Sequence, residues 1–290
     1  EANTNEKKLF DGIMASGRGR TAEAESILLS LDATSFGAMR GGHLSLTQAL
    51  LTSRVNPERA YELFEKARLL LPGTLVEEAA LRQIVVLAAK TSNRERFTKA
   101  AISYLSRFRR SAYVAGFETQ LAFHIVRFEG RDGLLILQEL LNAQPQGWDR
   151  CVACFLASIA EQAILAGKID LARTAAQAAM PFATDNSAEK QRVLLYKGAA
   201  LIVTNDFARG LDALNSVRTS DLNPKDKELH LASLSLAAKL RATPMLLTQA
   251  KLDASASGVP KHGHNFLPGE RQAEAKEALA SVDAILAQAR

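Results

Sequence analysis

Asn56–Ala67 reads NPERAYELFEKA, and this stretch carries the signals that begin and sustain an α-helix. Asn56 has a side chain that caps helices, Pro57 fits the first helical position, and Glu58 places an acid in the first turn. Apolar residues then follow at separations of three, three and four, at Tyr61, Phe64, Ala67 and Leu71. This spacing predicts a helix that packs on one face.

The same transition from loop to helix recurs about every 37 residues, at Arg20, Pro57, Arg94, Arg131, Lys168, Asn205 and Ala242. The helices expected after these points are Thr21–Leu31, Glu58–Leu71, Arg96–Phe108, Gly133–Leu141, Ile169–Met180, Phe207–Val217 and Met245–Ala256. Helices expected before them include Val76–Ala89, Ala112–Phe128, Asp149–Ala166, Ser187–Val203 and Lys225–Leu240. The sequence therefore predicts about seven helix–turn–helix units.

Two stretches resemble the tetratricopeptide repeat. Asn56–Ala67 looks like its second helix, and Gly167–Ala172 is similar to the turn and helix start of another unit. Because the period exceeds that family's 34 residues, antiparallel helix pairs of no specific family are the alternative. One pair cannot bury both of its apolar faces, so pairs are expected to stack. The expected fold class is all-α, an α-solenoid of about seven tetratricopeptide-like helix pairs with a C-terminal closing helix.

Glycine and proline mark the expected breaks in this array. Gly37, Gly41 and Gly42 predict a loop within Thr34–Gly42. A second group, in Gly258–Glu270, predicts a linker, after which Arg271–Arg290 reads as a final helix. We therefore expect a helical-repeat domain over residues 1–257, a linker loop over 258–270, and a C-terminal helix over 271–290 that packs on the array.

Composition and charge favour a folded helical protein without a nucleic-acid partner. Apolar residues make up 47% and charged residues 23% of the chain, and the formal charge is +5. The densest basic cluster joins Arg94, Arg96, Lys99, Arg107, Arg109 and Arg110, with Phe97, Tyr104 and Phe108 interleaved. A stacking platform for an anionic partner uses such a pattern, but the spacing is equally that of a buried helix stripe, which is the commoner use.

Targeting and membrane signals are sparse. No run of 18 or more apolar residues occurs, so no membrane span is expected. The chain opens with Glu1 and lacks a signal peptide, so we expect a processed or trimmed form whose targeting segment has been removed.

The motifs that could support chemistry are weak. Cys151 and Cys154 form a CxxC pair without a preceding strand or further zinc ligands, which favours buried thiols over a disulfide or a redox or metal site. His262 and His264 lie in the expected linker and lack further ligands. Glu77 and Glu78 point to different faces of a helix and so cannot easily line one site. No catalytic residue, cofactor, metal or small-molecule substrate is therefore expected.

Three stretches resemble the MotC family, periplasmic motility proteins of flagellated alphaproteobacteria related to the rhizobia. They are Arg40–Leu50 (RGGHLSLTQAL), Ala67–Arg82 (ARLLLPGTLVEEAALR) and Phe123–Phe128 (FHIVRF). The likeness is strong over roughly residues 35–130. It implies a secreted protein required for flagellar rotation that associates with MotB, the peptidoglycan-anchored stator subunit. Neither an enzyme activity nor a set of binding residues comes with this resemblance.

Contact residues for a protein partner are predicted from the register instead. In tetratricopeptide-like arrays the first helix of each pair lines the concave groove, and Ala60, Ala172 and Ala208 serve as equivalent points. The residues that then face the groove are Arg82, Gln120, His124, Arg127, Glu161 and Lys197. Gln120, His124 and Arg127 share one helical stripe because they are spaced by four and three. The alternative is that these are ordinary polar residues on a solvated face.

The function expected is that of a periplasmic scaffold or chaperone of the flagellar motor that holds MotB. One alternative is a tetratricopeptide-type binding module unrelated to motility. A second is the superhelical accessory region of a cell-wall lytic enzyme of the transglycosylase type, which would need a catalytic domain for which this chain has no spare length.

Overall fold

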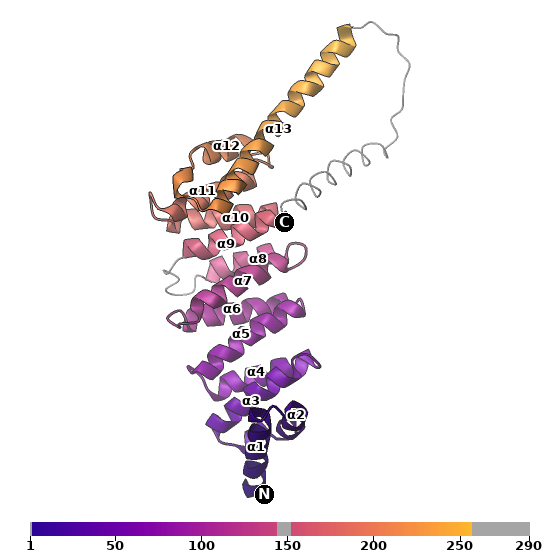
Figure 1. Cartoon of the computed structure of the whole chain (residues 1–290), viewed down its shortest axis with the longest axis vertical. Coiled ribbons are helices and arrows are strands. Elements are labelled where there is room, and N and C mark those ends of the chain that lie inside the picture. The colour runs from indigo at the N-terminus through magenta and orange to yellow at the C-terminus, as the bar shows by residue number, and fades with distance from the viewer. Residues whose placement is uncertain (1, 144–151, 257–290) are drawn as a thin grey trace. The chain divides into compact units, whose positions relative to one another are not determined.

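The structure, a computed structural model, describes residues 2–143 and 152–256, and within them every regular element is helical (Figure 1). The chain divides into two compact units, Glu1–Ala237 and Ala238–Arg290. The first unit contains nearly all of the described helices, and of the second only the C-terminal part of α13 is described. The expectation of an all-α fold is confirmed.

The α-helices in chain order are α1 Ala2–Gly17, α2 Thr21–Leu29, α3 Ala38–Thr52, α4 Pro57–Leu70, α5 Leu75–Lys90, α6 Arg94–Arg107, α7 Val114–Arg127, α8 Asp132–Ala143, α9 Val152–Leu165, α10 Ile169–Ala179, α11 Ala188–Leu201, α12 Phe207–Asn215 and α13 Pro224–Ala256. Short 3-10 turns occur at Ala33–Ser35, Met180–Phe182 and Thr219–Asp221.

Helices pack as a repeating array of pairs. Each odd-numbered helix from α1 to α11 contacts the even-numbered helix that follows it. The odd-numbered helices α3, α5, α7, α9 and α11 also contact one another in succession, and α6, α8 and α10 do the same. Figure 1 shows the pairs of the first unit following one another in chain order. The fold is therefore a helical-repeat solenoid, with six pairs followed by α13 in the described part.

Residues that end and begin helices recur at the turns inside the pairs. Ser92, Gly130 and Gly167 join α5 to α6, α7 to α8 and α9 to α10, and their φ angles are 52°, 53° and 68°. Each helix C-terminus is thus ended by a left-handed residue, a role for which glycine is best suited. The N-cap residues of α4 and α6 are Asn56 and Asn93, and their side chains accept hydrogen bonds from the backbone N–H groups of Arg59 and Arg96. The cap expected at Asn56 is confirmed, and the cap at Asn93 was not predicted.

A continuous apolar core runs through the array from α3 to α13, and a smaller separate cluster lies at the N-terminal end. Phe97 and Tyr104 are fully buried in the continuous core. Phe97 packs edge-to-face on Phe128, with ring centres 4.9 Å apart. Phe97 and Tyr104 therefore belong to the buried stripe of α6 and cannot stack on the bases of an anionic partner.

One expected break is wrong and another is shorter than expected, since only Thr34–Gly37 of the expected loop lie outside an α-helix. Gly41 and Gly42 lie inside α3 instead of a loop, because they allow close packing. A Cβ atom on Gly41 would lie 2.4 Å from the carbonyl oxygen of Ala33, and one on Gly42 would lie 2.6 Å from the side chain of Leu71. No break occurs at Ala242 either.

Helix α13 runs without interruption where Lys225–Leu240 and Met245–Ala256 were expected as two helices. No glycine or asparagine is available there to end the first half in a left-handed conformation. Pro244 lies within α13 and does not end it, although proline in a helix interior usually kinks or breaks the helix. The expected linker 258–270 and C-terminal helix 271–290 lie outside the described residues and stay a prediction.

Candidate partner-binding surface

Arg82 on α5 reaches towards the start of α7. Its guanidinium lies 4.7 Å from the centre of the Tyr113 ring, and Tyr113, directly before α7, is 52% exposed. Stacking of arginine on an aromatic ring combines dispersion with attraction to the ring quadrupole. Arg82 is therefore partly buried, but the aromatic ring that it holds in place faces solvent.

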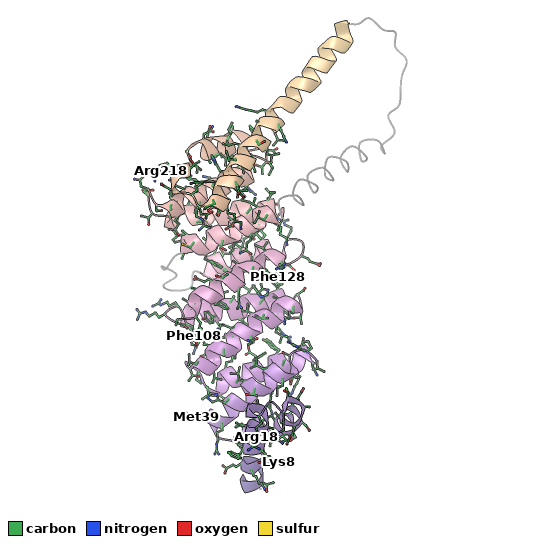
Figure 2. The ribbon with its side chains drawn as sticks, in the orientation of Figure 1. Lys8, Arg18, Met39, Phe108, Phe128 and Arg218 are labelled. Atoms are coloured by element: carbon green, nitrogen blue, oxygen red, sulfur yellow. The ribbon has the colours of Figure 1, made fainter. Side chains whose placement is uncertain are left out.

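Helix α7 exposes one continuous stripe along its length. Tyr113, Gly116, Gln120, Phe123 and Arg127 follow at separations of three, four, three and four, and all five are exposed. We call these five residues the α7 stripe. The guanidinium of Arg127 lies 3.8 Å from the centre of the Phe123 ring, so the stripe ends on a second arginine–aromatic stack. Figure 2 labels Phe108, which follows α6, and Phe128, which follows α7.

His124 departs from its predicted role, because it is half-buried beside the stripe. Its ring meets Phe97 and Phe123 edge-on, with ring centres 6.4 Å and 5.4 Å away. Burial lowers the pKa of His124, and the nearby charges of Arg127 and Lys90 lower it further. Of the three residues predicted on this helix, Gln120 and Arg127 reach solvent, whereas His124 packs against α6.

The loop between α6 and α7 is anchored by two buried carboxylates at the start of α5. Glu77 and Glu78 are each 2% exposed. Arg107 pairs with Glu77 at 2.8 Å, while the hydroxyls of Tyr104 and Ser111 donate to Glu78 at 2.7 Å and 2.5 Å. Burial and the hydrogen bond to Glu78 raise the pKa of Tyr104. Because both carboxylates are occupied in this way, they hold the loop in place and do not line a catalytic site.

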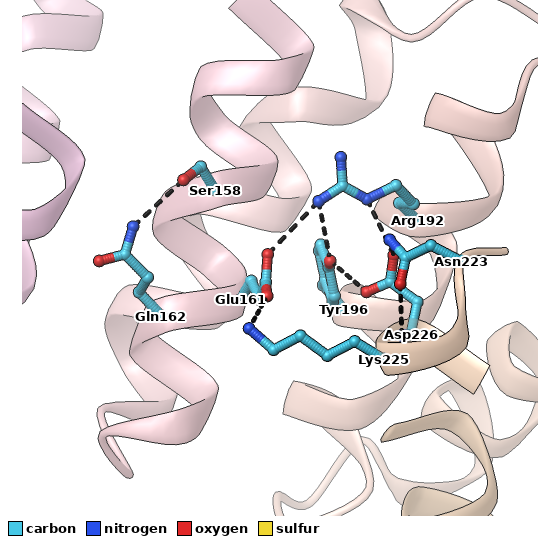
Figure 3. Close-up of polar contacts among 8 residues, drawn as sticks. All are labelled: Ser158, Glu161, Gln162, Arg192, Tyr196, Asn223, Lys225 and Asp226. Atoms are coloured by element: carbon cyan, nitrogen blue, oxygen red, sulfur yellow. Dashed lines mark hydrogen bonds and ion pairs between the residues drawn. The ribbon is translucent and has the colours of Figure 1, made fainter. Parts of the chain in front are cut away.

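Glu161 belongs to a polar network that joins α9, α11 and α13 (Figure 3). It pairs with Arg192 at 3.3 Å and with Lys225 at 2.6 Å. Arg192 also pairs with Asp226 at 3.0 Å, and the hydroxyl of Tyr196 donates to Asp226 at 2.5 Å. Asp226 is 2% exposed. The network satisfies its own charges and therefore joins successive pairs, which sequence spacing alone did not indicate.

Lys197 lies on a different side of α11. It lines a hollow of about 430 Å³ between α10, α11 and α12, together with Arg173, Asp206, Arg209 and Asp212. The structure thus brings Arg82, Gln120 and Arg127 to the α5–α7 region, places Glu161 in the network, and separates Lys197 from both.

Sequence reasoning missed Glu118, which lies on α7 and is half-buried. Burial raises the pKa of this carboxyl to about 7. Among the described residues it has no hydrogen-bond or ion-pair partner. Glu118 stands between Phe117 and Leu121, and nothing in that pattern distinguishes it from an ordinary surface acid.

The comparisons with known proteins name the family. The family model described as chemotaxis protein MotC matches residues 1–290, which is the whole chain. The chain belongs to the MotC family. A similar protein, the chemotaxis protein MotC of Rhizobium meliloti (strain 1021), is 29% identical over 233 residues, which cover 79% of this chain and 52% of that protein. The chain thus spans about half the length of this relative, and no solved structure matches it.

The three stretches that resemble the MotC family have structural roles in this chain. Arg40–Leu50 contains the two glycines at which α3 packs closely. Ala67–Arg82 contains Glu77 and Glu78, the anchors of the α6–α7 loop. Phe123–Phe128 supplies Phe128 to the core and both members of the second arginine–aromatic stack. The expectation of a MotC-family protein is confirmed, and the family is one of chemotaxis and motility proteins.

Metal and membrane sites do not emerge from the described part of this MotC-family chain. There, no three His, Cys, Asp or Glu side chains gather as metal ligands would. No helix in that part is long and apolar enough to cross a membrane. Cys154 lies on α9, whereas Cys151, His262 and His264 lie outside the described residues.

Proposed function

We propose that this chain is a non-enzymatic scaffold of the flagellar motor in the periplasm, where it binds the periplasmic part of the stator protein MotB. The observation that carries the proposal is membership of the MotC family over the whole chain. The helical-repeat fold supports it, because stacked helix pairs present extended surfaces that suit protein ligands.

The contact surface that we propose is the α7 stripe with Arg82 beside it. Interfaces are enriched in aromatic residues and arginine, and their central anchors are often tyrosine, tryptophan and arginine. Tyr113 and Phe123 are 52% and 44% exposed, and each is held by a stacked arginine. Large aromatic side chains held in place before binding lose little entropy when a partner covers them. The predicted contacts of Glu161 and Lys197 stay predictions outside this surface.

A capture experiment tests the proposal. The chain is immobilised and exposed to the purified periplasmic part of MotB, and the Arg127→Glu variant is compared with Arg209→Glu. Arg209 is a suitable control because its side chain is 82% exposed on α12. We expect capture by the unmodified chain and by Arg209→Glu, with a loss of about tenfold or more in Arg127→Glu. Absence of capture by the unmodified chain would contradict the proposed partner, and equal capture by all three proteins would contradict the proposed surface.

A further inference from the structure

Gly116, about one helical turn from Tyr113 on the α7 stripe, has no packing reason to be glycine. A Cβ atom placed on Gly116 would meet nothing within 4 Å. Glycine in a helix costs about 1 kcal/mol relative to alanine. Among the other helical glycines, Gly17 ends α1 in open space, whereas a Cβ atom would approach a neighbour to less than 3.0 Å at Gly12, Gly41, Gly42, Gly133, Gly198 and Gly210. Those six close-packed glycines serve this chain's own packing, whereas Gly116 leaves bare backbone on an exposed surface inside a helix.

The bare backbone lies between the two arginine–aromatic stacks. On one side, Tyr113 carries Arg82, and on the other Phe123 carries Arg127. From Tyr113 to Arg127 the helix rises about 21 Å, at 1.5 Å per residue. An extended chain of about six residues covers this distance. The stripe therefore offers two cationic, aromatic ends and, next to Tyr113, a patch of bare backbone that another backbone can approach closely.

Three arginines lie at or next to the ends of the stripe, and Glu129, two residues beyond Arg127, is the exposed acid that follows α7. Arg82 and Arg127 lie at its two ends, and Arg110 is exposed on the anchored α6–α7 loop, without an ion-pair partner among the described residues. Glu77 and Glu78 are buried beneath the loop and already bonded. Glu118 is the remaining acid on α7, and its raised pKa leaves it only partly ionised at neutral pH. A segment with negative charge therefore complements this surface.

We propose that the α7 stripe, with Arg82 and Arg110, is the docking site for an extended protein segment of about six residues that is rich in carboxylates. The acidic side chains of the segment pair with Arg82, Arg110 and Arg127, and its backbone crosses Gly116. This inference rests on the proposed function, since it names the chemistry of the segment by which a motor partner is held. Its affinity falls with ionic strength because Arg110 and Arg127 are exposed.

The experiment uses the full chain and a fluorescein-labelled (Glu-Ser)₄ peptide, with (Gln-Ser)₄ as the uncharged counterpart, measured by fluorescence anisotropy. We expect (Glu-Ser)₄ to bind about tenfold more tightly than (Gln-Ser)₄. Gly116→Gln should weaken binding of (Glu-Ser)₄ about fivefold and Arg127→Glu about tenfold, whereas Arg209→Glu should leave it within about twofold. Because the space around Gly116 is open, Gly116→Gln should keep the circular dichroism spectrum of the unmodified chain.

Several outcomes would overturn the inference. Equal binding of the two peptides would show that carboxylates are not required. Unchanged binding of (Glu-Ser)₄ by both Gly116→Gln and Arg127→Glu would show that the peptide does not bind at the α7 stripe. Tighter, equally variant-sensitive binding of single-stranded DNA or of phosphatidylglycerol vesicles would reassign the surface to another class of ligand. If both variants capture MotB as well as the unmodified chain does, the proposed function stands and this inference is refuted. If the peptide binds as expected but MotB is not captured, the docking site stands and the proposed partner is refuted.

Discussion

Gly210→Ala provides a quantitative test of the helix-pair packing. Gly210 lies on α12 where that helix passes the end of α11. A Cβ atom there would lie 2.7 Å from the backbone nitrogen of Ile202 and 2.9 Å from the carbonyl carbon of Leu201. Since backbone atoms of packed helices cannot move aside cheaply, the overpacking costs about 1–3 kcal/mol. The better helix propensity of alanine returns up to about 1 kcal/mol. We therefore expect a net destabilisation of about 1–2 kcal/mol.

Gly116→Ala is the matched control, because the same methyl group enters open space. Only the propensity gain then applies, so this variant should be more stable than the unmodified chain by about 0.5–1 kcal/mol. Urea unfolding followed by far-ultraviolet circular dichroism measures both variants. The midpoint should fall for Gly210→Ala and rise for Gly116→Ala. A midpoint for Gly210→Ala equal to or above that of the unmodified chain would refute the close approach of α11 and α12.

Three further predictions follow from the buried polar groups. Asp226→Asn should destabilise the chain by about 2–4 kcal/mol, because it removes the buried charge that Arg192 faces. The control Asp206→Asn changes an exposed ion pair and should alter the free energy of unfolding in urea by about 0.5 kcal/mol or less. Equal effects of the two variants would contradict the network. Burial raises the pKa of Glu118 to about 7, so ionisation of this carboxyl destabilises the folded state. Below about pH 4, Glu118→Gln should have the same melting temperature as the unmodified chain, and its melting temperature should be increasingly the higher of the two as the pH rises through 7. A difference in melting temperature that does not change with pH would argue against the raised pKa. Glu78→Gln should speed trypsin cleavage in the α6–α7 loop, since it weakens the anchor of that loop; unchanged cleavage would show that the anchor is dispensable.

The repeat was predictable from sequence because its signals are local. Caps such as Asn56 and Asn93 act on backbone groups three residues away, and apolar spacing within one helix defines its buried face. Gly41 and Gly42 were misassigned because their role lies in contacts with Ala33 and Leu71, which sequence spacing does not reveal. The same limit applies to α13, where only the absence of a helix-ending residue separates a continuous helix from two short ones.

The exposure of the candidate contact residues on α7 was predicted in part for the same reason. Gln120 and Arg127 fall on one stripe by helical periodicity alone, and both are exposed. The orientation of a helix towards its neighbours depends on tertiary packing, so periodicity did not predict that His124 packs inwards or that Lys197 faces another side of α11. The stack of Arg82 on Tyr113 joins residues from two helices, which is also beyond local pattern.

Site-specific photo-crosslinking in a motile host is the most direct test of a partner-binding scaffold. A photoreactive amino acid replaces Gln120, in the centre of the α7 stripe, and in a parallel strain it replaces Arg209 on α12. After irradiation, adducts are isolated through a tag on the chain and identified by mass spectrometry. We predict an adduct with MotB from position 120 and none from position 209. Absence of a MotB adduct from position 120, or equal amounts from both positions, would contradict the account.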